Sequence, residues 1–233
     1  MALDQHTIQA NRVIEVGAGF GYFLDLLCKR PGTAPQIVAT EYGLPALNAL
    51  KSKGYDARAC DIRELDCAPV DLICAFQVLE HLDRLDALAE TFNRLILPGG
   101  YAILVVPNLA RINFNMANDS LLDMPPNHIG GWTREAFERF GKRAGLDLIE
   151  FDTEPHRLAD FVRQDIAYSY LRNAQRPGTL SNWSRLKRSS RFGKTIGAAV
   201  ALARAPRRLP VWLKAAQRND LGGSSFALLR KRA

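Results

Sequence analysis

Short apolar runs alternate with helical patterns along the first half of the chain, and this order leaves few folds open to it. The run Ala102–Val106 is apolar at every position, which is typical of a parallel strand covered by helices on both faces. We expect strands at 12–16, 36–40, 56–60, 71–76 and 101–106, with helices at about 20–30, 44–53 and 83–95. The alternation predicts an α/β fold with an open, doubly wound sheet.

The second half of the chain departs from this regular alternation. Asn108–Gly131 is predicted to be a long loop, and a helix at Thr133–Ala144 precedes two more strands, Leu146–Thr153 and Ser224–Leu229. About 70 residues separate these last two strands, far more than a usual connection. We therefore divide the chain into a core at 1–155, a basic helical insertion at 156–220 and a final strand segment at 221–233 that completes the sheet.

The formal net charge of +7 is distributed unevenly. Residues 1–155 hold 14 Lys and Arg against 21 Asp and Glu, whereas residues 156–220 hold 14 against three. In the insertion, one predicted helical face collects Phe192, Ile196, Val200 and Ala203. Such a basic amphipathic segment can lie on an anionic membrane surface or hold a phosphate-bearing acceptor. A solvated insertion packed on the core, contributing to a homodimer, is the alternative that the sequence leaves open.

A glycine-rich turn lies where the first strand meets the first helix, at Glu15–Gly21 (EVGAGFG). Glycines there let a ligand approach the backbone closely. The G-x-G-x-x-G fingerprint of dinucleotide sites would need glycine where this chain has Tyr22, which disfavours a nicotinamide-dependent oxidoreductase. Glu41 ends the second strand twenty residues after Gly21, a position from which a carboxylate can accept from both hydroxyls of a ribose. Together these features predict a nucleoside site.

With this turn and five further motifs in order, residues 12–155 resemble the class I S-adenosylmethionine (SAM)-dependent methyltransferases. Within that family the similarity is to the bacterial group of ubiquinone-pathway and glycan O-methyltransferases. The resemblance implies a Rossmann-like, seven-stranded, mostly parallel sheet with an antiparallel last strand. The further motifs are ATEYG (39–43), ACDIREL (59–65), DLICAFQVLEHL (71–82), LPGGYAILVVPN (97–108) and PPNHIGGWT (125–133).

The resemblance also implies which residues hold the cofactor SAM, whose product is S-adenosylhomocysteine. Glu15 and the turn glycines Gly17, Gly19 and Gly21 would surround its methionine part, and Glu41 would bind its ribose. The adenosine pocket and its closure would use Tyr42, Asp61, Ile62, Phe76 and Gln77.

Two histidines are candidates for acceptor chemistry, because an alcohol acceptor must lose a proton and an imidazole is a suitable base. His81 follows Glu80 directly after the fourth strand, and His128 lies in the loop before Trp132; a structural role is the alternative for each. In the ubiquinone-type relatives a Glu-x-x-Glu-His arrangement can hold a divalent metal. This chain has neutral Gln77 at the first position, so we predict no metal.

The sequence thus predicts an enzyme that moves a methyl group from SAM to an acceptor oxygen of a small molecule, a lipid precursor or an envelope glycan. An N- or C-methyltransferase of the same fold, or a non-catalytic SAM-binding regulatory or scaffold protein, is the alternative. Nucleic acid is disfavoured, because no Asn/Asp-Pro-Pro-Tyr motif occurs. With no leader and no membrane-length apolar run, we expect a cytoplasmic protein that can lie peripherally at the inner face of the membrane. The first predicted strand begins near residue 12, which leaves no room for the preceding helices that often cover the acceptor pocket in this fold, so we expect a chain that is short or truncated there.

Overall fold

The protein is described here from a computed structural model, which covers residues 2–8, 10–32, 34–118, 120, 123, 125–174 and 206–232. Its chain divides into two units, one formed by Met1–Glu154 with Ser224–Ala233 and the other by Pro155–Gly223. Each unit is described by itself.

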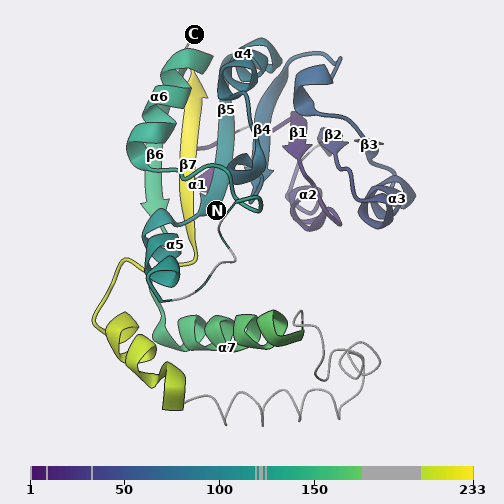
Figure 1. Cartoon of the computed structure of the whole chain (residues 1–233). Coiled ribbons are helices and arrows are strands. Elements are labelled where there is room, and N and C mark those ends of the chain that lie inside the picture. The colour runs from purple at the N-terminus through teal and green to yellow at the C-terminus, as the bar shows by residue number, and fades with distance from the viewer. Residues whose placement is uncertain are drawn as a thin grey trace. The chain divides into compact units, whose positions relative to one another are not determined.

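The first unit is built on a seven-stranded sheet with the order β3-β2-β1-β4-β5-β7-β6 (Figure 1). The pairs among β1 to β5 are parallel, and β7 is antiparallel to both β5 and β6. This confirms the predicted Rossmann-like sheet with its antiparallel last strand. The strands are β1 Arg12–Val16, β2 Gln36–Thr40, β3 Asp56–Arg58, β4 Val70–Phe76, β5 Ile96–Pro107, β6 Leu146–Thr153 and β7 Ser224–Lys231.

Helices join the strands and cover both faces of the sheet. Those of the first unit are α1 Ala2–Gln5, α2 Tyr22–Leu27, α3 Leu44–Ser52, α4 Leu85–Leu95, α5 Leu109–Met116 and α6 Arg134–Ala144, with short 3-10 helices η1 Ile62–Glu64 and η2 Leu79–His81. None of the helices that the structure describes is both long enough and apolar enough to cross a membrane.

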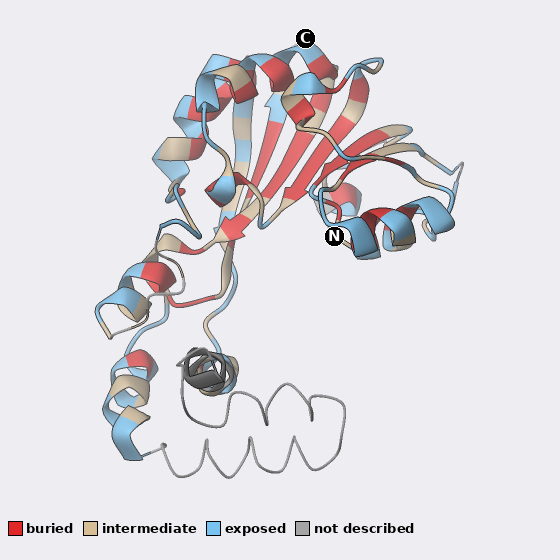
Figure 2. Ribbon diagram, turned by 45° about the vertical axis from the view of Figure 1, so that its right-hand side comes forward, coloured by how far each residue is buried: buried red, intermediate tan, exposed pale blue. Residues whose placement is uncertain are grey.

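Alternate side chains of the central strands enter two different apolar clusters, because successive residues of a strand point to opposite faces. Ile14 and Ile73 pack with Phe92 of α4 and Phe140 of α6 on one face. On the other face Val13, Leu72 and Cys74 pack with Leu27 of α2 and Leu3 of α1. The central strands are therefore buried on both sides, as Figure 2 shows.

Two helices depart from the sequence-based expectation. The predicted loop Asn108–Gly131 begins with α5, whose start is capped by the Asn108 side chain accepting from the Ala110 amide at 3.0 Å. In addition, α1 precedes the first strand, where we expected no helix, and its Leu3 is 1% exposed. Both helices are short and polar residues interrupt their apolar pattern, so their periodicity is weak in the sequence.

The second unit contains α7 Leu158–Ala174 and a helix at 206–216. Asp165 joins these helices, since it accepts from Arg208 Nη2 at 2.5 Å and from Trp212 Nε1 at 2.8 Å. His156 lies between the carbonyls of Ala215 and Leu221, at 3.1 and 3.3 Å. The predicted apolar face of Phe192, Ile196, Val200 and Ala203 lies outside the described residues.

Candidate functional site

The carboxyl ends of β1, β2 and β4 lie side by side at one edge of the sheet (Figure 1). The chain runs outward from β1 in one direction to β2 and β3 and in the other to β4 and β5, so the sheet reverses its order between β1 and β4. Ligands of open α/β sheets bind outside the strand ends at such a point. The glycine turn, Glu41 and Gln77 all follow these strand ends.

The three glycines of the turn have positive φ angles of 63° at Gly17, 53° at Gly19 and 75° at Gly21. A β-carbon on Gly17 would lie 2.6 Å from Cγ2 of Val78, and one on Gly21 would lie 2.7 Å from Cδ2 of Leu50. A β-carbon on Gly19 would meet nothing within 4 Å. Gly17 and Gly21 are thus required by packing, whereas Gly19 borders open space into which a ligand can come.

Glu41 fixes the glycine turn to the segment after β2. One carboxylate oxygen accepts from the Gly19 amide at 2.8 Å and the other from the Gly43 amide at 2.7 Å. A carboxylate oxygen has a further lone pair, so each can still accept from a hydroxyl. The predicted ribose contact fits this geometry and stays a prediction.

Glu15 is a buried acid beneath the turn, with 4% of its surface exposed. Burial raises the pKa of its carboxyl group to about 8. Its Oε2 atom has no hydrogen-bond partner among the residues that the structure describes. A cationic group bound at the turn would compensate this acid, so Glu15 suits a ligand with a positively charged centre, such as the sulfonium of SAM.

Three predicted adenosine contacts lie on the β2 and β3 side. Tyr42 is 68% exposed, while Ile62 is buried within the core at 2%. Asp61 accepts from Arg63 through its amide at 2.8 Å and its guanidinium at 2.6 Å, which lowers the pKa of the Asp61 carboxyl group. Tyr42 is therefore freely available to a nucleoside, Asp61 is already ion-paired, and contacts from all three stay predictions.

Phe76 and Gln77 lie at the end of β4. The ring of Phe76 packs against Phe23 with their centroids 4.8 Å apart. Gln77 has a φ of 58°, and its side-chain amide donates to the Ser224 hydroxyl at 3.4 Å. Their predicted role in closing the site is untested.

The structure brings the two candidate histidines together. The ring centroids of His81 and His128 are 4.9 Å apart, and His81 Nε2 lies 3.8 Å from Oε1 of Glu80. The amides of Ile129 and Gly130 donate to the Glu80 carbonyl at 2.9 and 3.1 Å, which holds the His128 loop against η2.

Burial changes the acid-base properties of this cluster. It raises the pKa of the Glu80 carboxyl group and lowers that of the His128 imidazole. We gave Glu80 no role from the sequence. A glutamate directly after an apolar strand was the available signal, but its burial depends on the loop that closes over it.

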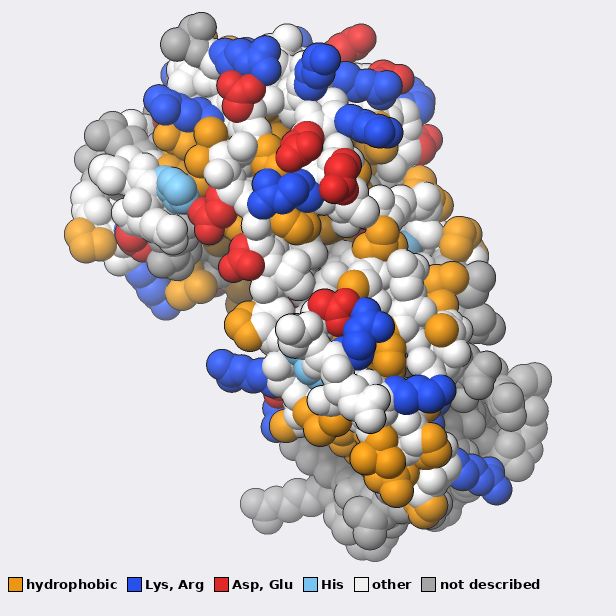
Figure 3. All heavy atoms as spheres, turned by 90° about the vertical axis from the view of Figure 1, so that its left-hand side faces the viewer, with side chains coloured by type: hydrophobic (Ala, Val, Ile, Leu, Met, Phe, Trp, Pro, Cys, Tyr) orange, Lys and Arg blue, Asp and Glu red, His pale blue; other side chains and the backbone are white. Residues whose placement is uncertain are grey.

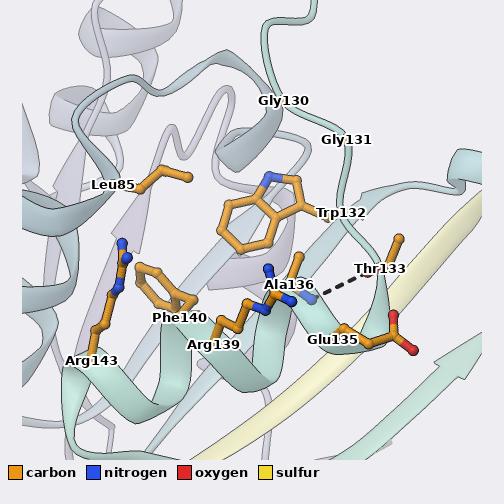
Figure 4. Close-up of a pocket in the computed structure, with 10 residues that line it drawn as sticks. All are labelled: Leu85, Gly130, Gly131, Trp132, Thr133, Glu135, Ala136, Arg139, Phe140 and Arg143. Atoms are coloured by element: carbon orange, nitrogen blue, oxygen red, sulfur yellow. Dashed lines mark hydrogen bonds between the residues drawn. The ribbon is translucent and has the colours of Figure 1, made fainter.

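A separate cavity of about 510 Å³ lies between the start of α4 and α6. Trp132 and Phe140 line it together with Leu85, and the guanidinium groups of Arg139 and Arg143 extend along it (Figure 4). None of the predicted cofactor residues contributes to its wall, so this cavity is distinct from the strand-end site.

Charged groups of both signs are interspersed on the face of the core around α6 and β6 (Figure 3). Arg143 pairs with Asp86, and Arg232 pairs with Asp147 at 2.6 Å. This mixing differs from the uniform basic surface that nucleic-acid binding usually uses.

Comparisons with known proteins agree with the observed fold. A family model described as "Methyltransferase domain" matches residues 3–150. A Mycolicibacterium smegmatis protein named "Probable S-adenosylmethionine-dependent methyltransferase" is 31% identical over 123 residues, which are 51% of this chain and 46% of that protein. The chain thus matches less than half the length of this curated relative.

Solved structures share the fold at low sequence identity. A SAM-dependent methyltransferase from Archaeoglobus fulgidus superposes with a TM-score of 0.57 and 15% identity, covering 99% of this chain and 91% of that one. The cyclase SpnF superposes with a TM-score of 0.59 and 17% identity, covering 95% and 75%. Because the family model spans β1 to β5 and part of β6, the chain belongs to the class I SAM-dependent methyltransferase family, whose cofactor is S-adenosyl-L-methionine and whose product is S-adenosyl-L-homocysteine.

Proposed function

We propose that this protein transfers a methyl group from SAM to a hydroxyl oxygen of a small molecule, a lipid precursor or an envelope glycan. The observation that carries the proposal is the buried acid Glu15 before the glycine turn, whose Oε2 has no hydrogen-bond partner among the described residues, together with the open space at Gly19. A bound sulfonium compound would supply a positive charge to compensate this acid.

The proposed donor site uses the chain's own groups for binding and orientation. Glu41 would accept from the ribose hydroxyls while it keeps the Gly19 and Gly43 amides in place. Tyr42 would cover the nucleoside, because its ring is largely exposed beside Glu41. When bound, SAM supplies an activated methyl group, so the protein has to align an acceptor and exclude water.

The proposed acceptor side is the cluster of Glu80, His81 and His128. Val78 contacts the glycine turn at Gly17, and η2 with Glu80 and His81 follows directly, so the cluster adjoins the proposed donor site in the chain. A hydroxyl acceptor needs a group that takes its proton, and the histidine pair can do this. An amine acceptor depends less on a group that takes its proton. Because the cluster supplies such groups, we favour an oxygen acceptor.

A SAM-binding protein without catalysis is the second candidate. The same fold occurs in SpnF, which is named as a cyclase, so the fold alone does not determine the reaction. A screen with isotopically labelled SAM against hydroxyl, amine and carbon acceptors would separate these functions. Label transferred to oxygen supports our proposal, whereas SAM binding without transfer to any acceptor favours the second candidate.

The donor site is tested by calorimetric titration of SAM and S-adenosylhomocysteine into wild type and Glu41→Ala. We expect the substitution to weaken SAM about tenfold or more, because charge-assisted hydrogen bonds to the ribose are lost. Asp71→Ala is the matched control, since Asp71 also accepts from a backbone amide, that of Arg12 at 2.8 Å, but at the opposite edge of the sheet. Absence of affinity for both compounds in the folded wild type contradicts the proposal.

A further inference from the structure

Glu80 and His81 of η2 and His128 of the loop between α5 and α6 form a cluster that can hold a metal. One ligand atom from each of the three side chains lies within 4.8 Å of the others. We propose that these residues bind a divalent transition-metal ion of the Zn²⁺ class. Two imidazoles and one carboxylate are a ligand set suited to such ions.

The hydrogen bond of His81 prepares its other nitrogen for coordination. Its Nδ1 lies 2.5 Å from the carbonyl oxygen of Asn127. A carbonyl only accepts, so Nδ1 carries the proton and Nε2 keeps a free lone pair. That lone pair is on the atom 3.8 Å from Glu80 Oε1. Metal-binding histidines characteristically donate their second N–H to a carbonyl or carboxylate in this way.

The buried carboxylate of Glu80 would be stabilised by a bound cation. The residue is 1% exposed, and its Oε2 has no hydrogen-bond partner in the described part of the chain. Leaving a buried carboxylate oxygen unpaired is unfavourable, whereas a metal ion would satisfy it. This observation is independent of the spacing of the three ligands.

His128 completes the set from a distant part of the sequence. Its Nδ1 is buried, has no hydrogen-bond partner among the residues that the structure describes, and lies 3.5 Å from Oδ1 of Asp123. The Asp123 carboxylate is near enough to the His128 ring to fix its orientation when a metal ion binds. The loop is fixed at its base by the Ile129 and Gly130 amides, which donate to the Glu80 carbonyl.

The geometry requires only a small contraction. Ligand atoms about 2.1 Å from a tetrahedral ion lie roughly 3.4 Å apart, and the present spacing reaches 4.8 Å. Three protein ligands leave a position for water or an acceptor oxygen. The predicted absence of metal rests on Gln77, whose side-chain amide donates to the Ser224 hydroxyl. That prediction does not take account of His128, because no sequence pattern places His128 beside Glu80.

One consequence of the metal site rests on the proposed function. A hydroxyl bound to such an ion loses its proton more readily than a free one, which would assist methyl transfer to oxygen. The histidine pair would then hold the ion and would not itself take the proton, which would pass from the bound hydroxyl to solvent water.

The metal proposal is tested on the full chain, stripped with a chelator and titrated with Co²⁺ alone. We expect the visible absorption bands of one bound Co²⁺ per chain, which Zn²⁺ displaces. His81→Ala and His128→Ala should each weaken binding about tenfold or more. His6→Ala is the matched control, because His6 contacts Glu150 at 2.6 Å in a pair outside the three-residue cluster.

Binding that is absent in wild type, or that His81→Ala and His128→Ala weaken no more than His6→Ala does, overturns the metal site. Glu80→Gln adds a test of the carboxylate, with circular dichroism reporting whether this buried substitution folds. SAM affinity is measured separately on the metal-free protein, so that failure of the donor site and failure of the metal site are distinguished.

Discussion

Two buried glutamates, Glu15 at the fourth position of β1 and Glu80 after the end of β4, share an unusual environment. Each is at most 4% exposed, and each has a carboxylate oxygen without a partner among the described residues. Carboxylates are rarely buried unless they are paired. Glu15 lies under the glycine turn and Glu80 beside the histidines, so both point to ligands that carry positive charge.

The raised pKa of Glu15 predicts how stability depends on pH. The carboxyl group titrates at about 8 in the fold instead of 4.5, so the folded state holds a proton that the unfolded state has lost. Stability of the free protein should therefore fall as pH rises between these values, by at most about 5 kcal/mol for this group. Glu15→Gln should remove this part of the slope, measured by urea unfolding between pH 5 and 8.5.

The same substitution should also change the affinity for SAM, whose dependence on pH is opposite to that of stability. Glu15→Gln should weaken SAM binding about tenfold, because a charged partner of the cofactor is lost. The wild-type affinity should rise with pH as Glu15 loses its proton. Glu90→Gln, a substitution of an exposed glutamate on α4, serves as the control. Equal pH slopes of stability in wild type and Glu15→Gln would exclude Glu15 as their cause.

At the level of elements, the glycine turn is where sequence and structure correspond most closely. Its spacing predicts a close approach of ligand to backbone, and the structure adds that all three glycines have positive φ angles, which few other residues tolerate. The sequence could not show that Gly17 packs on Val78 whereas Gly19 faces open space, since this depends on how η2 returns to the turn.

The open position at Gly19 can be tested against a glycine elsewhere. Gly19 and Gly99 have φ angles of 53° and 76°, and a β-carbon on either would meet nothing within 4 Å. Substitution by Ala should therefore cost each about 1 kcal/mol of stability from backbone strain. Only Gly19→Ala should also weaken SAM, because its methyl group would enter the proposed ligand space. If calorimetry finds the same SAM affinity for Gly19→Ala and Gly99→Ala, the ligand does not bind beside Gly19.

The acceptor side was less accessible from the sequence than the donor side. Apolar runs predict strands, and strand ends in a parallel sheet collect at one edge, which was enough to bring Glu41 near Gly19. His128 instead reaches Glu80 through a loop, whose path is set by two amides that donate to one carbonyl. A loop contact between residues so far apart in the sequence leaves no periodic pattern from which it could be predicted. The helix α5 within that region was missed for a related reason, because its length gives little periodicity.

Across the whole molecule, acidic and basic residues are concentrated in different parts of the chain. Residues 1–155 carry more acids than bases, while residues 156–220 carry 14 Lys and Arg against three acids. In the described helix at 206–216, Leu209 and Leu213 are 50% and 58% exposed, four residues apart and hence on one face. Basic residues beside exposed leucines are typical of a helix that lies on an anionic membrane surface.

We therefore propose that the basic unit binds anionic membranes, which would bring the enzyme to a lipid-linked acceptor. The full chain should float with phosphatidylserine-containing vesicles at low salt, less at high salt, and not with neutral vesicles. Reversing two exposed charges in this unit, Arg207→Glu with Lys214→Glu, should abolish most flotation, because each basic group near the surface contributes about 1 kcal/mol. Arg139→Glu with Lys142→Glu on α6 changes the net charge equally and should float as wild type does. If both double variants lose flotation alike, net charge is responsible and the basic unit is no specific membrane surface.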